Sequence, residues 1–381
     1  MKKHGLAKIL GILLLLVVIV SFILNGRSGA KDYVGLGDVL YNSFQTLRYF
    51  FYIVFFVLFI GGFYGVLNKA PAYKKLLDNI VTKLKPLGKK FIFIIILVFA
   101  VITALTGMTL PLLIFVPFVV SIILLLGYDK LVAISSTVVS MMVGYIGGIL
   151  VTFYNPNTGQ MTTYETFVGT DSQFSNLFPK LLLLFAGITL LIYFVNKHIK
   201  NVENKKVKYE LNDDSELLIN EVKGNYKNIK TWPLIIVLTV FFIILVLGLV
   251  PWNALFGIKV FTEFHTWLIG LSIKEFAIIP NIITSDLLAF GEWYAMGEAM
   301  TYMIISILLL VFTLVVALIG RVKVNDTIEG FVDGMKKMLP TAALVILAYT
   351  VLISSYNNGF IEGVISSYGK FNYGVSTLLA F

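Results

Sequence analysis

Cysteine is absent from this chain of 381 residues, and charged residues make up only 13% of it. The lack of cysteine excludes disulfide bonds, thiolate metal ligands and cysteine nucleophiles. The three histidines, His4, His198 and His265, lie far apart, and no HExxH motif or phosphate-binding loop occurs. We therefore expect no metal site, no cofactor, no enzymatic activity and no ATP-driven pumping by this chain alone.

The shortage of charge also excludes an ordinary soluble domain, in which roughly 25% of residues are charged. Hydrophobic residues make up 58% of the sequence, and the mean hydropathy is +0.90. Apolar runs of about 18–20 residues recur, which is the length that a helix needs to cross a bilayer. The net charge of +9 fits lysine-rich cytoplasmic loops. The sequence lacks a basic patch interleaved with stacking aromatics, the pattern typical of nucleic-acid binders, so we expect no nucleic-acid partner. The sequence therefore predicts an all-α polytopic membrane protein with lipid as its surroundings.

Five apolar runs each predict a single membrane span. They cover residues 9–24, 49–67, 178–195, 232–250 and 295–320. The first run follows Lys2 and Lys3 and could be a signal peptide, but it is long for one. We interpret it as a retained helix with a cytoplasmic N-terminus in a multi-pass protein of the plasma (inner) membrane.

Lysine-rich segments separate several of these spans. Residues 69–90 hold seven lysines and one acid, with apolar residues at helical spacing. This pattern predicts an amphipathic helix in the cytoplasmic interface, with a basic loop as the alternative. Residues 321–338 form a second such stretch. Residues 197–231 are predicted to be a basic cytoplasmic loop. The mixed segment 251–292 is predicted to form interfacial helices.

Two hydrophobic segments are interrupted by small or polar residues, and each predicts a re-entrant hairpin. The first covers about residues 91–126 and breaks at 106–111; the second covers about 339–381 and breaks at 354–359. The alternatives are a helix kink or two ordinary helices with a tight turn. The order of parts predicts two transporter repeats, residues 1–196 and 232–381. Inverted repeats need an odd number of crossings between corresponding elements, whereas the predicted spans give an even number. Either residues 251–292 contain a further crossing, or one segment is divided wrongly.

Paired interrupted segments indicate a transporter's solute site. Backbone that leaves a helix at membrane depth has unpaired N–H and C=O groups, which can serve a polar solute. The Ser/Gly-rich segment 131–152 could line the same cavity, although small residues also serve close helix packing. The predicted site for a small polar solute or coupling ion comprises Thr106, Gly107, Thr109, Ser135, Ser136, Thr137, Asn155, Asn157, Ser355, Asn357, Asn358 and Gly359.

Several short motifs, in the same order of parts, resemble the YfcC-like branch of the C4-dicarboxylate anaerobic carrier family. They are Leu126-Gly127-Tyr128-Asp129, Tyr154-Asn155-Pro156, Gly291-Glu292-Trp293-Tyr294, Phe331-Val332-Asp333-Gly334-Met335 and Asn358-Gly359-Phe360-Ile361. The resemblance implies an ion-transporter-superfamily fold with a dimerising scaffold and an elevator-type transport domain that carries two opposed hairpins. It also implies secondary transport of organic or dicarboxylic acids, amino acids or short peptides, coupled to Na⁺ or H⁺ or by exchange.

The sequence departs from the family pattern at three places. The first hairpin tip has Met108-Thr109-Leu110 where family members usually carry acids, and Ala348-Tyr349-Thr350 replaces an Ala-Arg-Gly-like stretch. The chain also stops within the second hairpin, so we expect a C-terminally short carrier. A non-transporting scaffold or a degenerate, truncated carrier is the alternative.

Overall fold

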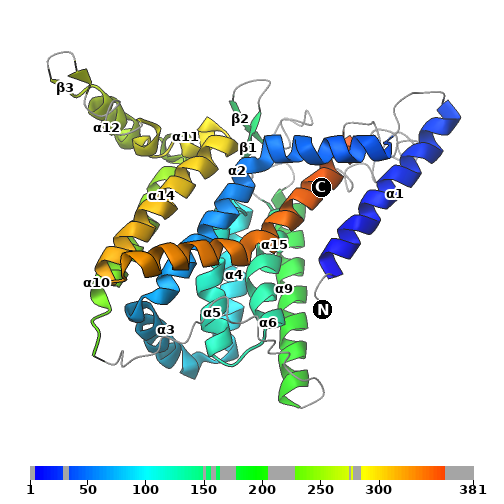
Figure 1. Cartoon of the computed structure of the whole chain (residues 1–381). Coiled ribbons are helices and arrows are strands. Elements are labelled where there is room, and N and C mark those ends of the chain that lie inside the picture. Colours follow the sequence, from blue (N-terminus) through cyan, green and yellow to red (C-terminus); the bar gives the residue numbers. More distant parts are fainter. Residues whose placement is uncertain are drawn as a thin grey trace. The chain divides into compact units, whose positions relative to one another are not determined.

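The computed structural model describes residues 5–28, 34–148, 152–155, 160–163, 177–204, 228–273, 276–277 and 285–356 (Figure 1). Within these ranges, seven helices are long and apolar enough to cross a membrane. They are α1 (Gly5–Ser28), α2 (Leu36–Lys69), α4 (Lys89–Thr106), α9 (Leu177–Glu203), α10 (Trp232–Leu249), α14 (Glu298–Ile319) and α15 (Val324–Tyr356). The predicted polytopic helical fold is confirmed, and each of the five predicted single spans corresponds to one of these helices.

Shorter elements connect the long helices. They are α3 (Pro71–Leu84), η1 (Lys85–Leu87), η2 (Pro111–Ile114), α5 (Val116–Leu125), α6 (Lys130–Ile134), η3 (Ser135–Val139), α7 (Ser140–Ile146), α11 (Trp252–Phe256), α12 (Val260–Ile269), η5 (Ser285–Leu288) and η6 (Trp293–Met296). Two antiparallel hairpins pair β1 (Thr152–Asn155) with β2 (Gln160–Thr163) and β3 (Ser272–Ile273) with β4 (Phe276–Ala277). The short helices predicted within 251–292 are present. Neither α11 nor α12 is long enough to cross a membrane, so the described part of that segment supplies no further crossing.

The chain divides into two compact units, and the helices α2 and α15 each contribute to both. Unit 1 comprises residues 1–61 and 335–381, and unit 2 comprises residues 62–334. These units are defined by contacts within the structure and do not test the predicted sequence repeats. The repeat boundaries at residues 196 and 232 therefore stay a prediction.

In unit 1, the N-terminal part of α2 runs antiparallel to the C-terminal part of α15. Asn42 donates a hydrogen bond to Ser354 over 3.0 Å, and the rings of Phe50 and Tyr349 stack with centroids 4.0 Å apart. Phe50 has non-helical backbone angles (φ −114°, ψ 16°) and marks a kink in α2. In α1, the Ser21 hydroxyl accepts a hydrogen bond from the N–H of Val34.

Two helix boundaries differ from the sequence prediction. Helix α2 begins at Leu36, 13 residues before the start of the span predicted at 49–67. Helix α15 continues from Val324 through Pro340, where an amphipathic helix and a separate hairpin arm were predicted. A proline inside a helix removes one backbone hydrogen bond and favours a kink, but it does not have to end the helix. Residues 357–381 lie outside the described part, so the second hairpin stays a prediction.

In unit 2, glycines allow the backbones of α2 and α15 to touch. A Cβ atom on Gly65 would lie 2.0 Å from the carbonyl oxygen of Gly330, and the ring of Phe331 covers Gly62. Lys69 and Glu329 form an ion pair of 3.4 Å beside this crossing. Small residues that bring two backbones together are the usual means of helix packing inside membranes.

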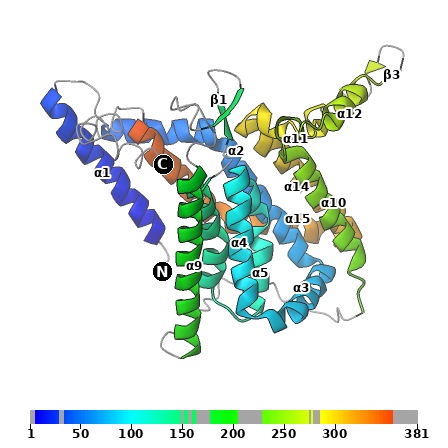
Figure 2. The same ribbon diagram turned by 180° about the vertical axis from the view of Figure 1, so that it is seen from behind.

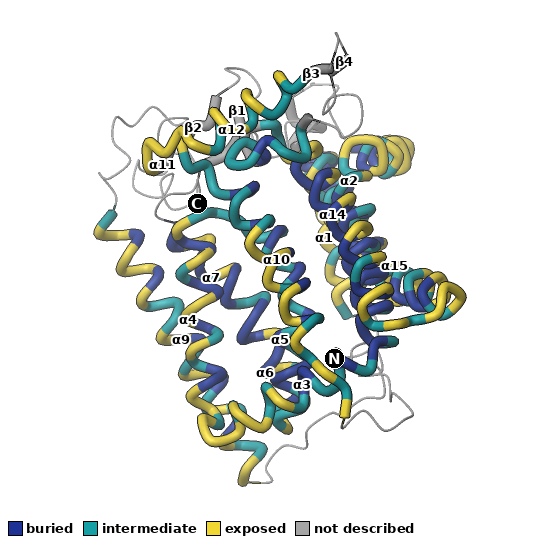
Figure 3. The backbone as a smooth tube through the Cα atoms, turned by 90° about the vertical axis from the view of Figure 1, so that its left-hand side faces the viewer, coloured by how far each residue is buried: buried dark blue, intermediate teal, exposed yellow. Residues whose placement is uncertain are grey.

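The helices α4, α5, α6–η3–α7 and α9 pack side by side in unit 2 (Figure 2). Glycines again set the spacing: a Cβ on Gly144 would lie 2.2 Å from the Ala100 carbonyl, and one on Gly147 would lie 2.5 Å from Leu184. Apolar side chains on the outer faces of α9 and α10 are exposed (Figure 3), for example Phe185 and Phe242. Such faces require lipid to cover them.

Candidate functional site

The first interrupted segment forms a helical hairpin built from α4, η2 and α5. Helix α4 ends where Gly107 adopts a left-handed conformation (φ 68°) and donates its N–H to the Thr103 carbonyl over 2.7 Å. Glycine is the residue that enters this conformation without strain. The two arms return to the same end of the bundle, because a Cβ on Gly88 would lie 3.9 Å from the Tyr128 hydroxyl. Residues 91–126 therefore form two helical arms around a break at residues 107–110, a geometry shared by a re-entrant hairpin and by two ordinary helices with a tight turn.

The two threonines of the tip differ in what their polar groups contact. The Thr106 hydroxyl donates to the Ile102 carbonyl over 2.7 Å and accepts from the N–H of Met108 over 3.2 Å. Thr109 is half-buried, and neither its N–H nor its hydroxyl has a hydrogen-bond partner among the described residues. Of the predicted tip residues, Thr109 is thus the one with groups available to a solute.

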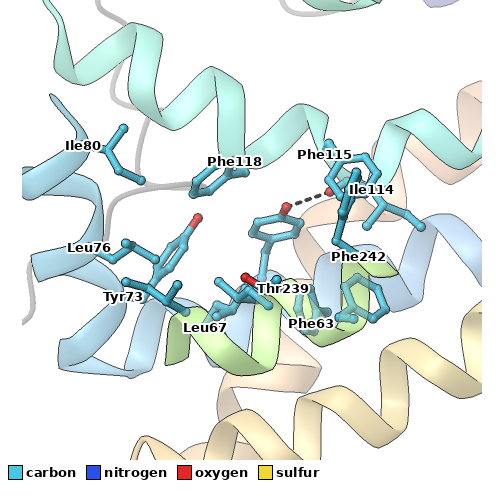
Figure 4. A pocket seen from close by; sticks show the side chains of 14 residues that line it. Phe63, Leu67, Tyr73, Leu76, Ile80, Ile114, Phe115, Phe118, Thr239 and Phe242 are labelled. Atoms are coloured by element: carbon cyan, nitrogen blue, oxygen red, sulfur yellow. Dashed lines mark hydrogen bonds between the residues drawn. The ribbon is translucent and has the colours of Figure 1, made fainter. Parts of the chain in front are cut away.

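A tyrosine from α2 fixes the descending arm of the hairpin. The hydroxyl of the buried Tyr64 donates a hydrogen bond of 2.7 Å to the Ile114 carbonyl of η2 (Figure 4, dashed line). This carbonyl belongs to the irregular backbone just after the tip, where it would otherwise be buried without a partner. The contact holds the break in one conformation within unit 2.

The predicted Ser135, Ser136 and Thr137 lie on a buried π-helical turn, η3. The hydroxyls of Ser136 and Thr137 donate to Val132 and Ala133 carbonyls, and the Ser140 hydroxyl bonds the carbonyls of both Ser135 and Ser136 at 3.0 Å. These hydroxyls satisfy the backbone of their own helix. A π-turn often marks a functional site, so a role for these three residues in solute binding stays a prediction.

The structure does not bring the π-turn and the hairpin tip together. Helices α4 and α7 run parallel, and Gly144 of α7 lies beside Ala100 of α4. Residues at the same level on the two helices therefore differ by 44 in number. The same offset places Ser136 near the level of Ile92, 14 residues before Thr106. At 1.5 Å per helical residue, the separation along the helix is about 20 Å.

The remaining predicted residues are spread over other parts of the chain. Asn155 ends strand β1 and pairs with Gln160 in the ladder. Ser355 lies in unit 1, where its hydroxyl donates to the Val351 carbonyl over 2.7 Å. Asn157, Asn357, Asn358 and Gly359 lie outside the described residues.

Four buried polar side chains, Asn42, Thr46, Thr350 and Ser354, form a polar ladder between α2 and α15 in unit 1 that was not predicted from the sequence. Besides the Asn42–Ser354 bond, the Thr350 hydroxyl donates to the Thr46 hydroxyl over 3.3 Å, and all four side chains are buried. Asn42 and Thr46 are spaced four residues apart, as are Thr350 and Ser354. This i, i+4 spacing of polar side chains on two helices is the signal that could have revealed the ladder.

A buried acid–histidine pair was also missed. One carboxylate oxygen of Asp129 accepts the N–H of Val132 over 2.9 Å and caps α6, and the other lies 2.7 Å from His198 Nε2 of α9. The neighbouring Tyr128 is partly buried, which raises the pKa of its hydroxyl, and the Glu203 carboxylate adds to this rise. The pair joins two helices at the end of the bundle opposite the hairpin tip.

The seven long apolar helices of the described ranges indicate a multi-pass membrane protein. Broken helices of the kind seen at residues 107–110 are a feature of many transporters. Comparison with protein families agrees with this class. The chain belongs to the C4-dicarboxylate anaerobic carrier family, whose model matches residues 45–380. No curated protein and no solved structure matches the chain.

Proposed function

We propose that the protein is a secondary active transporter that moves a four-carbon dicarboxylate or a related small organic acid across the plasma membrane. Membership of the dicarboxylate carrier family is the observation that carries the proposal. The hairpin tip supports it, because broken helices supply binding groups for polar solutes in transporters. Amino acids and short peptides remain in the proposed substrate range, and coupling is to Na⁺ or H⁺ or by exchange.

The proposed mechanism uses the ends of the two half-helices. The last carbonyls of α4 carry partial negative charge, and the first N–H groups of the descending arm carry partial positive charge. A cation is favoured beside the former and a carboxylate beside the latter. The N–H and hydroxyl of Thr109, which no described residue bonds, lie between them and would bind a carboxylate oxygen directly.

Four finer assignments belong to the same proposal. The hairpin is re-entrant, with its tip inside the membrane, and a second hairpin at residues 339–381 opposes it. The transport domain moves like an elevator against a scaffold that forms a homodimer. The N-terminus is cytoplasmic, which follows from the lysine-rich segments on that side. The chain falls in the YfcC-like branch of its family, on the motifs quoted above.

Uptake by the purified protein in proteoliposomes tests the proposal. Radiolabelled succinate, an amino acid and a dipeptide are offered under imposed Na⁺ and H⁺ gradients and with preloaded solute. We expect gradient-driven or exchange-driven accumulation of the dicarboxylate above that of empty vesicles. A folded, dimeric protein that accumulates none of these solutes would indicate a non-transporting scaffold or a degenerate carrier instead.

A further inference from the structure

A basic cavity lies in unit 2, away from the hairpin tip, where the ends of five helices meet. Its volume is about 700 Å³, and the ends of α2, α3, α10, α14 and α15 contribute to its wall. Four cationic side chains line it against one acid, Asp326. The cations are Lys69, Lys230, Arg321 and Lys323. Among the described residues, Lys69 pairs with Glu329 and no acid pairs with Lys230, Arg321 or Lys323, so the cavity wall carries an excess of positive charge.

Arg321 is held in this wall by strained backbone. It follows α14 and has a φ of +52°, the only positive φ among the described residues other than glycine. The bonds Arg321 N–H to Leu318 and Val322 N–H to Ala317 close the helix end in the motif that normally takes glycine at this position. Strained residues of this kind persist only where the surrounding structure holds them, and they cluster at ligand-binding and active sites. An arginine here places a guanidinium at the cavity, which a glycine could not do.

Figure 4 shows the side chains that line an apolar cavity of about 380 Å³. This cavity adjoins the basic one along α3 and α10. On α3, Ala72 lines the basic cavity and the next residue, Tyr73, lines the apolar one. On α10, Leu234 and Ile235 do the same. Aromatic and aliphatic side chains from α2, α3, α5 and α10 form its wall, including Phe63, Leu76 and Phe118. Ile235 and Phe242 are 42% and 49% exposed, so the wall reaches the outer surface of α10. We call the two spaces the headgroup cavity and the chain cavity.

We propose that these adjoining cavities bind one anionic phospholipid, with its phosphate among Lys230, Arg321 and Lys323 and an acyl chain in the chain cavity. Basic pockets between membrane helices on the cytoplasmic side bind anionic headgroups, and the lysine-rich segments place this end of the helices on that side. Trp232 lines the headgroup cavity and is 59% exposed, as expected of a tryptophan at headgroup depth. A soluble anion would use the cations but leave the chain cavity empty.

Lipid-dependent thermal stability of the full chain tests the headgroup cavity. The delipidated protein in detergent receives phosphatidylglycerol, phosphatidylcholine, glycerol 3-phosphate or succinate, and its unfolding temperature is measured. We expect phosphatidylglycerol to raise the unfolding temperature by several degrees more than the other three additives. An Arg321→Gly, Lys323→Gln variant should lose this difference. The control Lys83→Gln, which removes a cation of exposed α3 outside the cavity, should keep it.

Substitutions in α10 test the chain cavity separately. Thr239→Trp fills the cavity, whereas Val240→Trp adds the same bulk at an exposed position that does not line it. The phosphatidylglycerol difference should be lost in the first variant and kept in the second. An equal rise with glycerol 3-phosphate or succinate would assign the headgroup cavity to a soluble anion and overturn the proposal. A difference that survives Arg321→Gly, Lys323→Gln or Thr239→Trp would overturn it as well.

Discussion

Gly65 and Gly330 face each other where α2 and α15 pack in unit 2, and the contact leaves no room for a methyl group. A Cβ on Gly65 would lie 2.0 Å from a carbonyl oxygen and 3.0 Å from the Cα of Gly334, all of it backbone that cannot rotate away. The sequence shows glycines here, but it does not show which of them touch another backbone.

Gly65→Ala should therefore destabilise the protein. Overpacking costs typically 1–3 kcal/mol, and the need to move a helix backbone puts this site at about the upper end of that range. The free energy of unfolding in detergent micelles measures the loss. Gly37→Ala is the matched control in the same helix, because nothing lies within 4 Å of its Cβ position. It should be neutral or stabilising, by up to about 1 kcal/mol. Equal effects at the two positions would contradict the close approach.

The Asp129 carboxylate has two roles that different substitutions separate. Asn can still cap α6 but carries no charge for His198, whereas Ala loses both interactions. We expect Asp129→Ala to lower the free energy of unfolding by about 2.5–4 kcal/mol, from a helix cap of about 1 kcal/mol and a charged buried hydrogen bond of about 1.5–3 kcal/mol. Asp129→Asn should lose only the contribution of the charged hydrogen bond to His198 and keep that of the helix cap. In a His198→Ala background, Asp129→Asn should cost little; a full loss there would mean that His198 is not the partner.

At the scale of helices, local hydropathy predicted the spans well and their extensions poorly. Apolar runs of span length identified α1, α10 and α14 within four residues at each end, whereas α9 continues eight residues past its predicted end. Residues 36–48 were missed as part of α2 because their polar side chains resemble a loop. Asn42 and Thr46 are instead satisfied by α15, more than 300 residues away along the chain. A partner so far away in the sequence cannot be identified from the hydropathy of neighbouring residues.

A double-mutant cycle on Asn42→Leu and Ser354→Ala tests the polar ladder. Hydrogen bonds between membrane helices contribute about 0.6 kcal/mol on average and reach about 1.7 kcal/mol. We expect a coupling free energy in this range between the two positions, measured by unfolding in micelles. Asn42→Leu with Ser355→Ala is the control cycle, because the Ser355 hydroxyl bonds its own helix. A coupling as large in the control as in the test cycle would argue against the Asn42–Ser354 bond.

At the scale of the whole molecule, the sequence predicted the class of protein and the position of the first helix break. The Gly107 and Pro111 signals located the first hairpin tip, because both residues leave a local mark on the backbone. The sequence could not show that the Thr106 hydroxyl is hydrogen-bonded whereas Thr109 has no partner among the described residues, or that Ser136 lies about 20 Å from the tip along the helices. Those facts depend on rotamers and on which helices run parallel.

The absence of cysteine makes the central claim directly measurable, since a single introduced cysteine is the only thiol in the chain. Thr109→Cys in proteoliposomes is treated with a membrane-impermeant maleimide from either side, with and without a four-carbon dicarboxylate. If the hairpin tip is the solute site of a carrier, the reagent labels Thr109→Cys from both sides, and the dicarboxylate slows labelling by about tenfold or more. Thr82→Cys on exposed α3 should be labelled from one side only and at an unchanged rate. Labelling of Thr109→Cys from one side alone, at a rate that the dicarboxylate leaves unchanged, would contradict a carrier with its site at this tip.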